Sequence, residues 1–244
     1  MKKFSLQLYS LRKETEKDFK GAIEKVAKMG YTGVEFAGYG GLAAEEMKEL
    51  LDANNLEAVS SHVGIDELEN NLEYHINFLK TCGCQYIICP YTVMETAEDA
   101  IKIAERLNVI ADKCAMAGMN FGYHNHAHEF KKDGDEYLFD IMFSHCNDLV
   151  LAEPDVYWVK FADAEPVDVI RKYAGKTPLV HLKQLGIVDG EKKNVVFDKG
   201  IIDFKDIVKV AELLGTEHFI VEQEALDEDQ FNSCKIDADV MKSL

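Results

Sequence analysis

One complete structural repeat lies in residues 86–126, which have the sequence YIICPYTVMETAEDAIKIAERLNVIADKCAMAGMNFGYHNH. The β-branched and aromatic residues of Tyr86–Tyr91 predict a strand, and the apolar residues of Ala97–Ala117 recur at helical spacing. Gly118 stands where a helix often ends, and Asn120–His126 predicts the next strand. A strand, a helix and a second strand in this order indicate a parallel βαβ unit.

The same alternation continues in both directions along the chain. Further strands are predicted at Phe4–Leu8, Gly33–Phe36, Leu56–Ser61, Leu149–Asp155, Pro178–Lys183 and His218–Glu224. Further helices are predicted at Asp18–Met29, Ala44–Ala53, Leu68–Thr81, Tyr137–Ser144, Val167–Tyr173, Phe204–Leu214 and Asp237–Leu244. Eight alternations in 244 residues, without a linker-like stretch, predict an α/β fold in which residues 1–244 form a single-domain (β/α)8 barrel. A doubly wound sheet usually has fewer strands and a glycine-rich first turn, which this sequence lacks.

Composition limits the partners and the location of the protein. Lys and Arg number 27 and Asp and Glu number 44, which gives a net charge of −17 that repels nucleic acid. The N-terminal residues become polar too early for a signal peptide, and no apolar run is long enough to span a membrane. The six cysteines lack paired metal-site spacing and are expected to be reduced. A cytoplasmic protein without membrane contacts is predicted, and a homodimer is expected because soluble enzymes often form twofold pairs.

Polar side chains follow most of the predicted strands. They are Glu35, His62, His124, His126, Asp155, His181, Lys183, Glu222 and Glu224. The carboxyl ends of the strands form the active-site face of such a barrel, and residues two apart on a strand share a face. Any one of these histidines alone is more often a hydrogen-bonded structural residue than a ligand. The set as a whole predicts a shared site at the barrel mouth.

A divalent metal would explain this concentration of titratable groups. Burying several unpaired charges at one end of a barrel costs several kcal/mol each unless a cation or mutual pairing offsets it. Carboxylates with one or two imidazoles suit Mn²⁺, Mg²⁺, Co²⁺ or Zn²⁺, and the absence of thiolates among them argues against a structural zinc site.

The same residues resemble the xylose isomerase-like (β/α)8 superfamily, in its sugar phosphate isomerase/epimerase branch. The stretches that carry the resemblance are Ser5–Arg12, Gly33–Phe36, Ser60–His62, Tyr123–Phe130, Pro154–Trp158, His181–Gln184, Gly200–Phe204 and Val221–Glu224. Each stretch is short, but they follow the family order along nearly the whole chain.

The resemblance implies a metal held by Asp155, His181 and Glu222. Many family members have a glutamate where His124 stands, so the fourth ligand is either Glu129 or His124 itself. Glu129 is preferred, since a third carboxylate better balances a divalent charge. The family also often has an aspartate at the position of Gln184 and a more glycine-rich turn before Asp203, so a phosphorylated substrate is not implied.

The implied chemistry is isomerisation or epimerisation of a small sugar or polyol by proton transfer next to a carbonyl. Glu222 and His126 are the expected acid/base residues and Lys183 the expected oxyanion stabiliser. Substrate contacts are expected from Glu35, His62, His124 and Trp158. The same residues would also serve a dehydratase acting on an inosose or 3-keto sugar, or a non-catalytic sugar-binding barrel. An endonuclease IV-like activity is disfavoured, because the multi-zinc site needs more ligands and the DNA needs a basic face.

Overall fold

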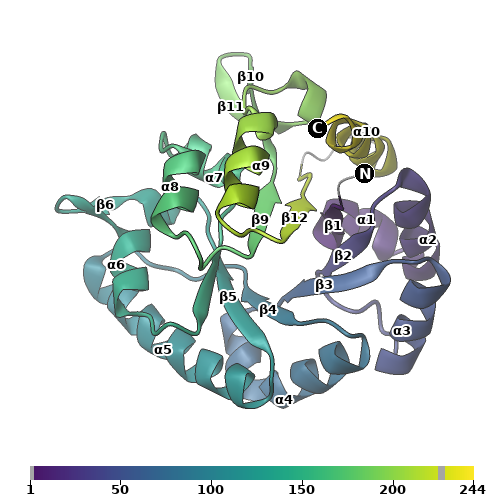
Figure 1. The fold of residues 1–244 in the computed structure, drawn as a ribbon, viewed down its shortest axis with the longest axis horizontal. Coiled ribbons are helices and arrows are strands. Elements are labelled where there is room, and N and C mark those ends of the chain that lie inside the picture. Colours follow the sequence, from purple (N-terminus) through teal and green to yellow (C-terminus); the bar gives the residue numbers. More distant parts are fainter. Residues whose placement is uncertain (1–2, 225–228) are drawn as a thin grey trace.

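The computed structural model describes residues 3–224 and 229–244 and shows a nearly closed barrel of parallel strands (Figure 1). Eight strands neighbour one another in the order β8-β5-β4-β3-β2-β1-β12-β9. Their bounds are β1 Ser5–Gln7, β2 Gly33–Phe36, β3 Glu57–His62, β4 Tyr86–Cys89, β5 Asn120–His124, β8 Val150–Glu153, β9 Leu179–Leu182 and β12 His218–Val221. The predicted (β/α)8 barrel is therefore confirmed.

Helices surround the strands on the outside of the ring (Figure 1). They are α1 Arg12–Thr15, α2 Phe19–Met29, α3 Ala44–Ala53, α4 Ile65–Thr81, α5 Ala97–Met116, α6 Leu138–His145, α7 Val156–Phe161, α8 Pro166–Lys172, α9 Phe204–Leu213 and α10 Gln230–Ser243. Local signals set their ends: the Thr96 and Asp99 side chains cap α5, and Gly30, at φ +98°, ends α2. Within the two described ranges, none of these helices has the length and apolar character needed to cross a membrane.

Three parts of the chain differ from the prediction. The strand expected to continue to Asp155 ends at Glu153, and Asp155 is instead the N-cap of α7, which begins at Val156. A hairpin of β10 Gln184–Val188 and β11 Glu191–Val195 follows β9 where no strands were predicted. A second, very short hairpin pairs β6 Lys132–Asp133 with β7 Glu136–Tyr137. Both hairpins extend loops and leave the barrel order unchanged.

The inward faces of the strands change from apolar to polar along the barrel axis. The buried cluster Val59, Tyr86, Ile88, Leu179 and Ile220 fills the interior near the amino ends of the strands. Two residues after Leu179 and Ile220, the same strand faces carry His181 and Glu222. The apolar layer supports the fold, and the polar layer above it forms the floor of the mouth.

The barrel closes between β8 and β9 with very little backbone pairing. The register between them reduces to one isolated parallel bridge, Asp155 with His181, and the His181 N–H donates to the Pro154 carbonyl at 2.9 Å. Pro154 has no N–H, so it cannot extend a ladder, and proline is usually confined to sheet edges for this reason. The seam thus brings two of the predicted metal ligands side by side.

The C-terminal helix α10 is fixed to the barrel by a buried carboxylate. Oδ1 of Asp237 accepts a hydrogen bond from the Phe197 N–H at 2.7 Å, and its Oδ2 lies 3.5 Å from Nε2 of Gln223. Burial raises the pKa of Asp237 from 3.8 to about 7. The folded chain therefore holds a proton on Asp237 over a pH range in which the unfolded chain has lost it.

This shift predicts that the Asp237 contribution to stability decreases as pH rises from about 4 to about 7, by up to about 4 kcal/mol. The neutral side chain of Asp237→Asn should remove that slope, so the variant should gain stability relative to the native chain across this range. Urea unfolding of both proteins at several pH values measures the difference. Asp239→Asn, an exposed change on the same helix, should leave the native slope in place. Parallel curves for the Asp237 variant and the native chain would refute the assignment.

Candidate active site at the barrel mouth

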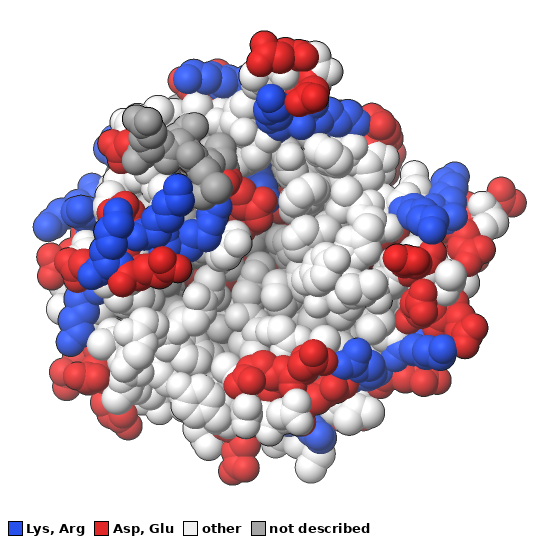
Figure 2. Space-filling view, turned by 180° about the vertical axis from the view of Figure 1, so that it is seen from behind, with Lys and Arg blue, Asp and Glu red and all other residues white. Residues whose placement is uncertain are grey.

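A cavity of about 400 Å³ opens at the carboxyl ends of the strands. It is lined by Tyr9, Ala37, His62, Pro90, Tyr91, His124, His126, Glu222 and Glu224. Figure 2 shows a hollow at the centre of one face, with acidic side chains at its upper edge, while most lysines and arginines lie toward the periphery. The size suits a small ligand, and five of the lining residues, His62, His124, His126, Glu222 and Glu224, were predicted from sequence.

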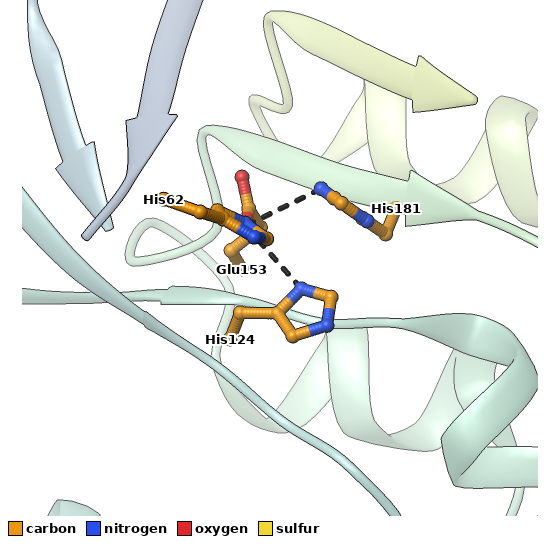
Figure 3. A group of neighbouring side chains, drawn as sticks. All are labelled: His62, His124, Glu153 and His181. Atoms are coloured by element: carbon orange, nitrogen blue, oxygen red, sulfur yellow. Dashed lines mark hydrogen bonds and ion pairs between the residues drawn. The ribbon is translucent and has the colours of Figure 1, made fainter. Parts of the chain in front are cut away.

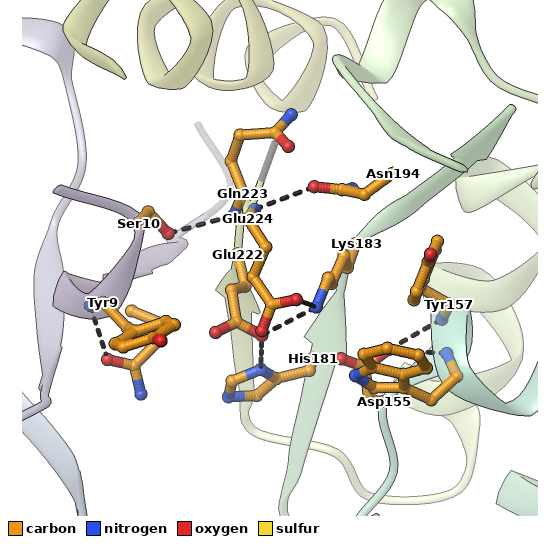
Figure 4. Close-up of polar contacts among 12 residues, drawn as sticks. Tyr9, Ser10, Asp155, Tyr157, His181, Lys183, Asn194, Glu222, Gln223 and Glu224 are labelled. Carbon is orange, nitrogen blue, oxygen red and sulfur yellow. Dashed lines mark hydrogen bonds and ion pairs between the residues drawn. The ribbon is translucent and has the colours of Figure 1, made fainter. Parts of the chain in front are cut away.

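Four donor side chains converge at this mouth and are called the upper donor group: His124, Asp155, His181 and Glu222. One ligand atom from each lies within 4.8 Å of the others. Asp155 is fixed by its position as the N-cap of α7, where Oδ1 accepts the N–H groups of Tyr157 and Trp158 at 2.7 and 3.1 Å. Its Oδ2 is buried and has no hydrogen-bond partner among the described residues, so it is available to a cation (Figure 4).

A second set, the lower donor group, consists of His62, His124, Glu153 and His181 (Figure 3). Glu153 is completely buried and was missed in the sequence analysis. Its signal was present, because a glutamate in an otherwise apolar strand, two residues before Asp155, must share the inward face with that residue.

The two groups use opposite nitrogens of the same imidazoles. His181 Nδ1 lies 3.5 Å from Glu222 Oε2 above, and its Nε2 lies 3.4 Å from Glu153 Oε2 below. His124 Nε2 lies 3.8 Å from Asp155 Oδ2, and its Nδ1 lies 3.4 Å from Glu153 Oε2. Each ring therefore connects an upper carboxylate with a lower one.

The electrostatics of the mouth suit a divalent cation. The carboxylates of Glu35, Glu153, Asp155 and Glu222 are all buried, together with the Lys183 ammonium. Burial raises the pKa of Asp155 to about 7, and burial together with Glu35 raises the pKa of Glu153 to about 7. A divalent cation bound beside Asp155 and Glu153 would favour their ionised forms and lower both pKa values again. The oxygen and imidazole donors match Mn²⁺, Mg²⁺, Co²⁺ or Zn²⁺.

The predicted residue Glu129 lies outside both donor groups. Its Oε1 accepts from the Tyr123 hydroxyl at 2.8 Å, and its Oε2 accepts from the His126 N–H at 2.9 Å. Of the two candidates for the fourth position, the structure brings His124 to Asp155, His181 and Glu222, and it uses Glu129 to hold the chain after β5. A carboxylate facing a hydroxyl and an N–H is already satisfied as a hydrogen-bond acceptor.

Lys183 and Trp158 lie beside the cavity-lining residues His126, Glu222 and Glu224. Nζ of Lys183 lies 2.7 Å from Glu224 and 3.6 Å from Glu222, and 4.7 Å from the centre of the Trp158 ring (Figure 4). The centre of the Trp158 ring is 5.1 Å from that of His126. Burial and then Lys183 lower the pKa of His126 to about 3, so its imidazole is neutral near pH 7. Lys183 and Trp158 do not line the cavity directly; they hold the residues that do.

Glu35, which was expected to contact substrate, lies below the cavity floor. It is completely buried and is not among the lining residues. Burial alone would raise the pKa of Glu35, but His62 and His181 lower it to about 2. Glu35 therefore contacts the imidazoles of His62 and His181, which belong to the donor groups, instead of the cavity.

Comparison with known families finds one family model, described as xylose isomerase-like TIM barrel, that matches residues 23–244. Among curated proteins, inosose dehydratase from Clostridium beijerinckii is 23% identical over 84% of this chain and 82% of its own length.

Solved structures with the same barrel include a sugar phosphate isomerase/epimerase from Parabacteroides distasonis, which is 25% identical. It has a TM-score of 0.85, covering 99% of this chain and 94% of its own. A probable 3-DHS dehydratase from Bacillus anthracis has a TM-score of 0.78 at 14% identity, covering 99% of both chains. At that identity the second likeness concerns the fold alone.

Proposed function

Because the chain belongs to the xylose isomerase-like TIM barrel family, we propose that it is a divalent-metal-dependent isomerase or epimerase of a small keto sugar or keto polyol. The observation that carries the proposal is the upper donor group, His124, Asp155, His181 and Glu222, of which His124 and Glu222 line the cavity. The similarity to a sugar phosphate isomerase/epimerase along 99% of the chain supports the reaction class.

In the proposed reaction Glu222 removes a proton from the carbon next to the substrate carbonyl. Burial opposes the ionisation of Glu222, but Lys183 and His181 keep its pKa well below the usual range, so it is present as a carboxylate. A divalent ion in the upper donor group would stabilise the negative charge that develops on the carbonyl and neighbouring hydroxyl oxygens. Lys183 holds Glu222 and Glu224 in place, and Trp158 supports the ring of His126.

His126 is the second acid/base residue in this proposal. It lines the cavity together with Glu222, and its neutral imidazole can both accept and donate a proton. Return of the proton to the opposite face of the same carbon gives epimerisation, whereas return to the neighbouring carbon gives isomerisation.

The cavity favours an uncharged substrate. Among the residues that the structure describes, no lysine or arginine lines the cavity, and Glu222 and Glu224 would repel a phosphate dianion. The nearby cations are engaged: Lys183 pairs with Glu224, and Arg12 covers the Tyr9 ring and donates to the Glu224 carbonyl. Tyr9 and Tyr91 provide aromatic surface suited to a sugar ring.

Dehydration is the second candidate, favoured by the similarity to inosose dehydratase over 84% of this chain. Glu222 would again break the C–H bond next to the carbonyl. The electron pair would form a C=C bond as the β-hydroxyl leaves as water, with His126 donating a hydrogen bond to that oxygen and Glu222 passing on to it the proton taken from carbon. A sugar-binding barrel without catalysis is the third alternative and would lack proton transfer altogether.

A screen in D₂O with Mn²⁺ tests these alternatives together. Keto sugars, inososes and 3-keto-glycosides are incubated with the full chain, alongside phosphate esters of the same keto sugars, and followed by NMR and mass spectrometry. We expect deuterium incorporation next to the carbonyl of an unphosphorylated compound, with formation of an isomer or epimer. Loss of water would establish the dehydratase instead. Binding without exchange would refute catalysis, and faster exchange of a phosphate ester would refute the uncharged substrate.

A further inference from the structure

The lower donor group could be a second metal site or a hydrogen-bonded support for the first. Both groups share His124 and His181, and each ring nitrogen can take only one role at a time. The choice depends on where the imidazole protons lie, and the hydrogen bonds around Glu35 determine this.

The orientation of Gln7 is the first step. Its Oε1 accepts a hydrogen bond from the Tyr9 N–H at 3.0 Å, so its amide nitrogen must be the atom that lies 2.6 Å from Glu35 Oε1. An amide nitrogen only donates, which makes Glu35 Oε1 an acceptor. The Ser60 hydroxyl donates to the other oxygen of Glu35 at 2.5 Å.

A register irregularity produces this arrangement. The pairing of β2 with β3 shifts between Val34 and Glu35, so that Glu35 lies opposite Ser60. Such bulges redirect a side chain that regular pairing would aim elsewhere, and they are frequent beside active sites.

The proton positions on His181 follow from the acceptor role of Glu35. Nε2 of His181 lies 2.6 Å from the same Oε1, so Nε2 must carry the hydrogen. In the neutral ring, Nδ1 then has the lone pair, and it faces Glu222 in the upper donor group. Nε2 of His62 also lies 3.1 Å from Glu35 Oε1 and 2.9 Å from Glu153 Oε2. A cation in the lower donor group would therefore face the N–H groups of these imidazoles instead of nitrogen lone pairs.

We propose that Glu35 and Glu153 are positioning residues that fix the ring orientations of His181 and His124 and the proton position of His181, so that the chain binds one ion, in the upper donor group. This inference rests on the proposed metal site but not on the proposed reaction. Ligand histidines usually donate their second N–H to a carboxylate, and loss of that partner commonly weakens metal affinity about 10- to 100-fold.

The test is a Mn²⁺ titration of the chelator-treated full chain by calorimetry. We expect one ion per chain in the native protein, with the Kd raised about 10- to 100-fold in Glu35→Gln and in Glu153→Gln. Thermal unfolding without metal checks that both variants fold. Asp237→Asn is the matched control, because it also replaces a buried carboxyl group with an amide but lies outside both donor groups. Its Kd should equal that of the native chain.

A second measurement does not depend on variants. The ¹⁵N shifts of the His181 ring in the Mg²⁺- or Zn²⁺-loaded native chain report which nitrogen carries the proton. We expect the proton on Nε2. Two ions per chain, a proton on Nδ1, or unchanged Kd in both variants would overturn the inference while leaving the proposed metal site intact. Absence of any metal binding would overturn the proposed function as well.

Discussion

Glu222→Gln is expected to lower turnover by about 10²- to 10⁴-fold while retaining much of the metal, because general-base loss usually costs that much. The carboxylate lies on the cavity wall, with Oε2 3.5 Å from His181 Nδ1 and 3.6 Å from Lys183 Nζ. The amide keeps the shape and one coordinating oxygen, but it cannot accept the proton. Rate and metal content should be measured on the same preparation, with the substrate identified in the D₂O screen.

Glu217→Gln is the matched control for this change. It makes the same substitution just before the amino end of the same strand, where Glu217 contacts the Tyr86 hydroxyl and not the cavity. Its rate and metal content should be native. If Glu222→Gln retained near-native turnover, His126 would become the candidate base.

Asp155→Asn is expected to weaken Mn²⁺ binding by more than about 100-fold, beyond what loss of an outer partner of a ligand costs. The two oxygens of Asp155 have separate roles: Oδ1 caps α7, and Oδ2 faces the upper donor group. An asparagine can keep the capping oxygen while placing an NH₂ group toward the ion, where it repels the cation. Because burial raises the pKa of Asp155 to about 7, the metal-free variant should be at least as stable as the native chain near neutral pH, while its metal affinity falls steeply.

Asp203→Asn is the matched control for Asp155→Asn, because Asp203 also caps a helix but is not a candidate metal ligand. Asp203 caps α9 in the same manner, accepting the Lys205 and Asp206 N–H groups at 3.0 and 3.3 Å, and belongs to neither donor group. Metal affinity should be native in this variant. Equal effects of the two substitutions on Mn²⁺ affinity would show that Asp155 acts through helix stability instead of coordination.

The sequence predicts most of the barrel because strand and helix periodicities are local. β2 and α3 begin and end where predicted, and the other barrel strands differ by a few residues at their ends. The β10–β11 hairpin was missed because β11 is mostly polar, with Lys192 partly buried and Lys193 exposed, so it carries little apolar alternation. The helix α7 was missed because Asp155 was interpreted as a strand end and not as a helix cap.

The candidate site was predicted less completely than the fold. Polar strand ends indicated His62, His124, His126 and Glu222, which do line the cavity. The positions of Glu35 and Glu129 depend on a bulge and on a turn after β5, which redirect side chains without a local sequence signature. The proton position on His181 depends on Glu35, which is 146 residues away along the chain, so only the folded chain defines it.

The seam between β8 and β9 gives an ion in the upper donor group a mechanical role. Asp155 and His181 form the isolated bridge at this seam, and Pro154 limits further pairing. An ion coordinated by both residues would link β8 to β9, the pair of neighbouring strands in the barrel with the least backbone hydrogen bonding. Part of its binding free energy would then be folding free energy. The barrel would then stay closed for longer at higher metal concentration. It would also resist proteases that cleave the opened strands for longer.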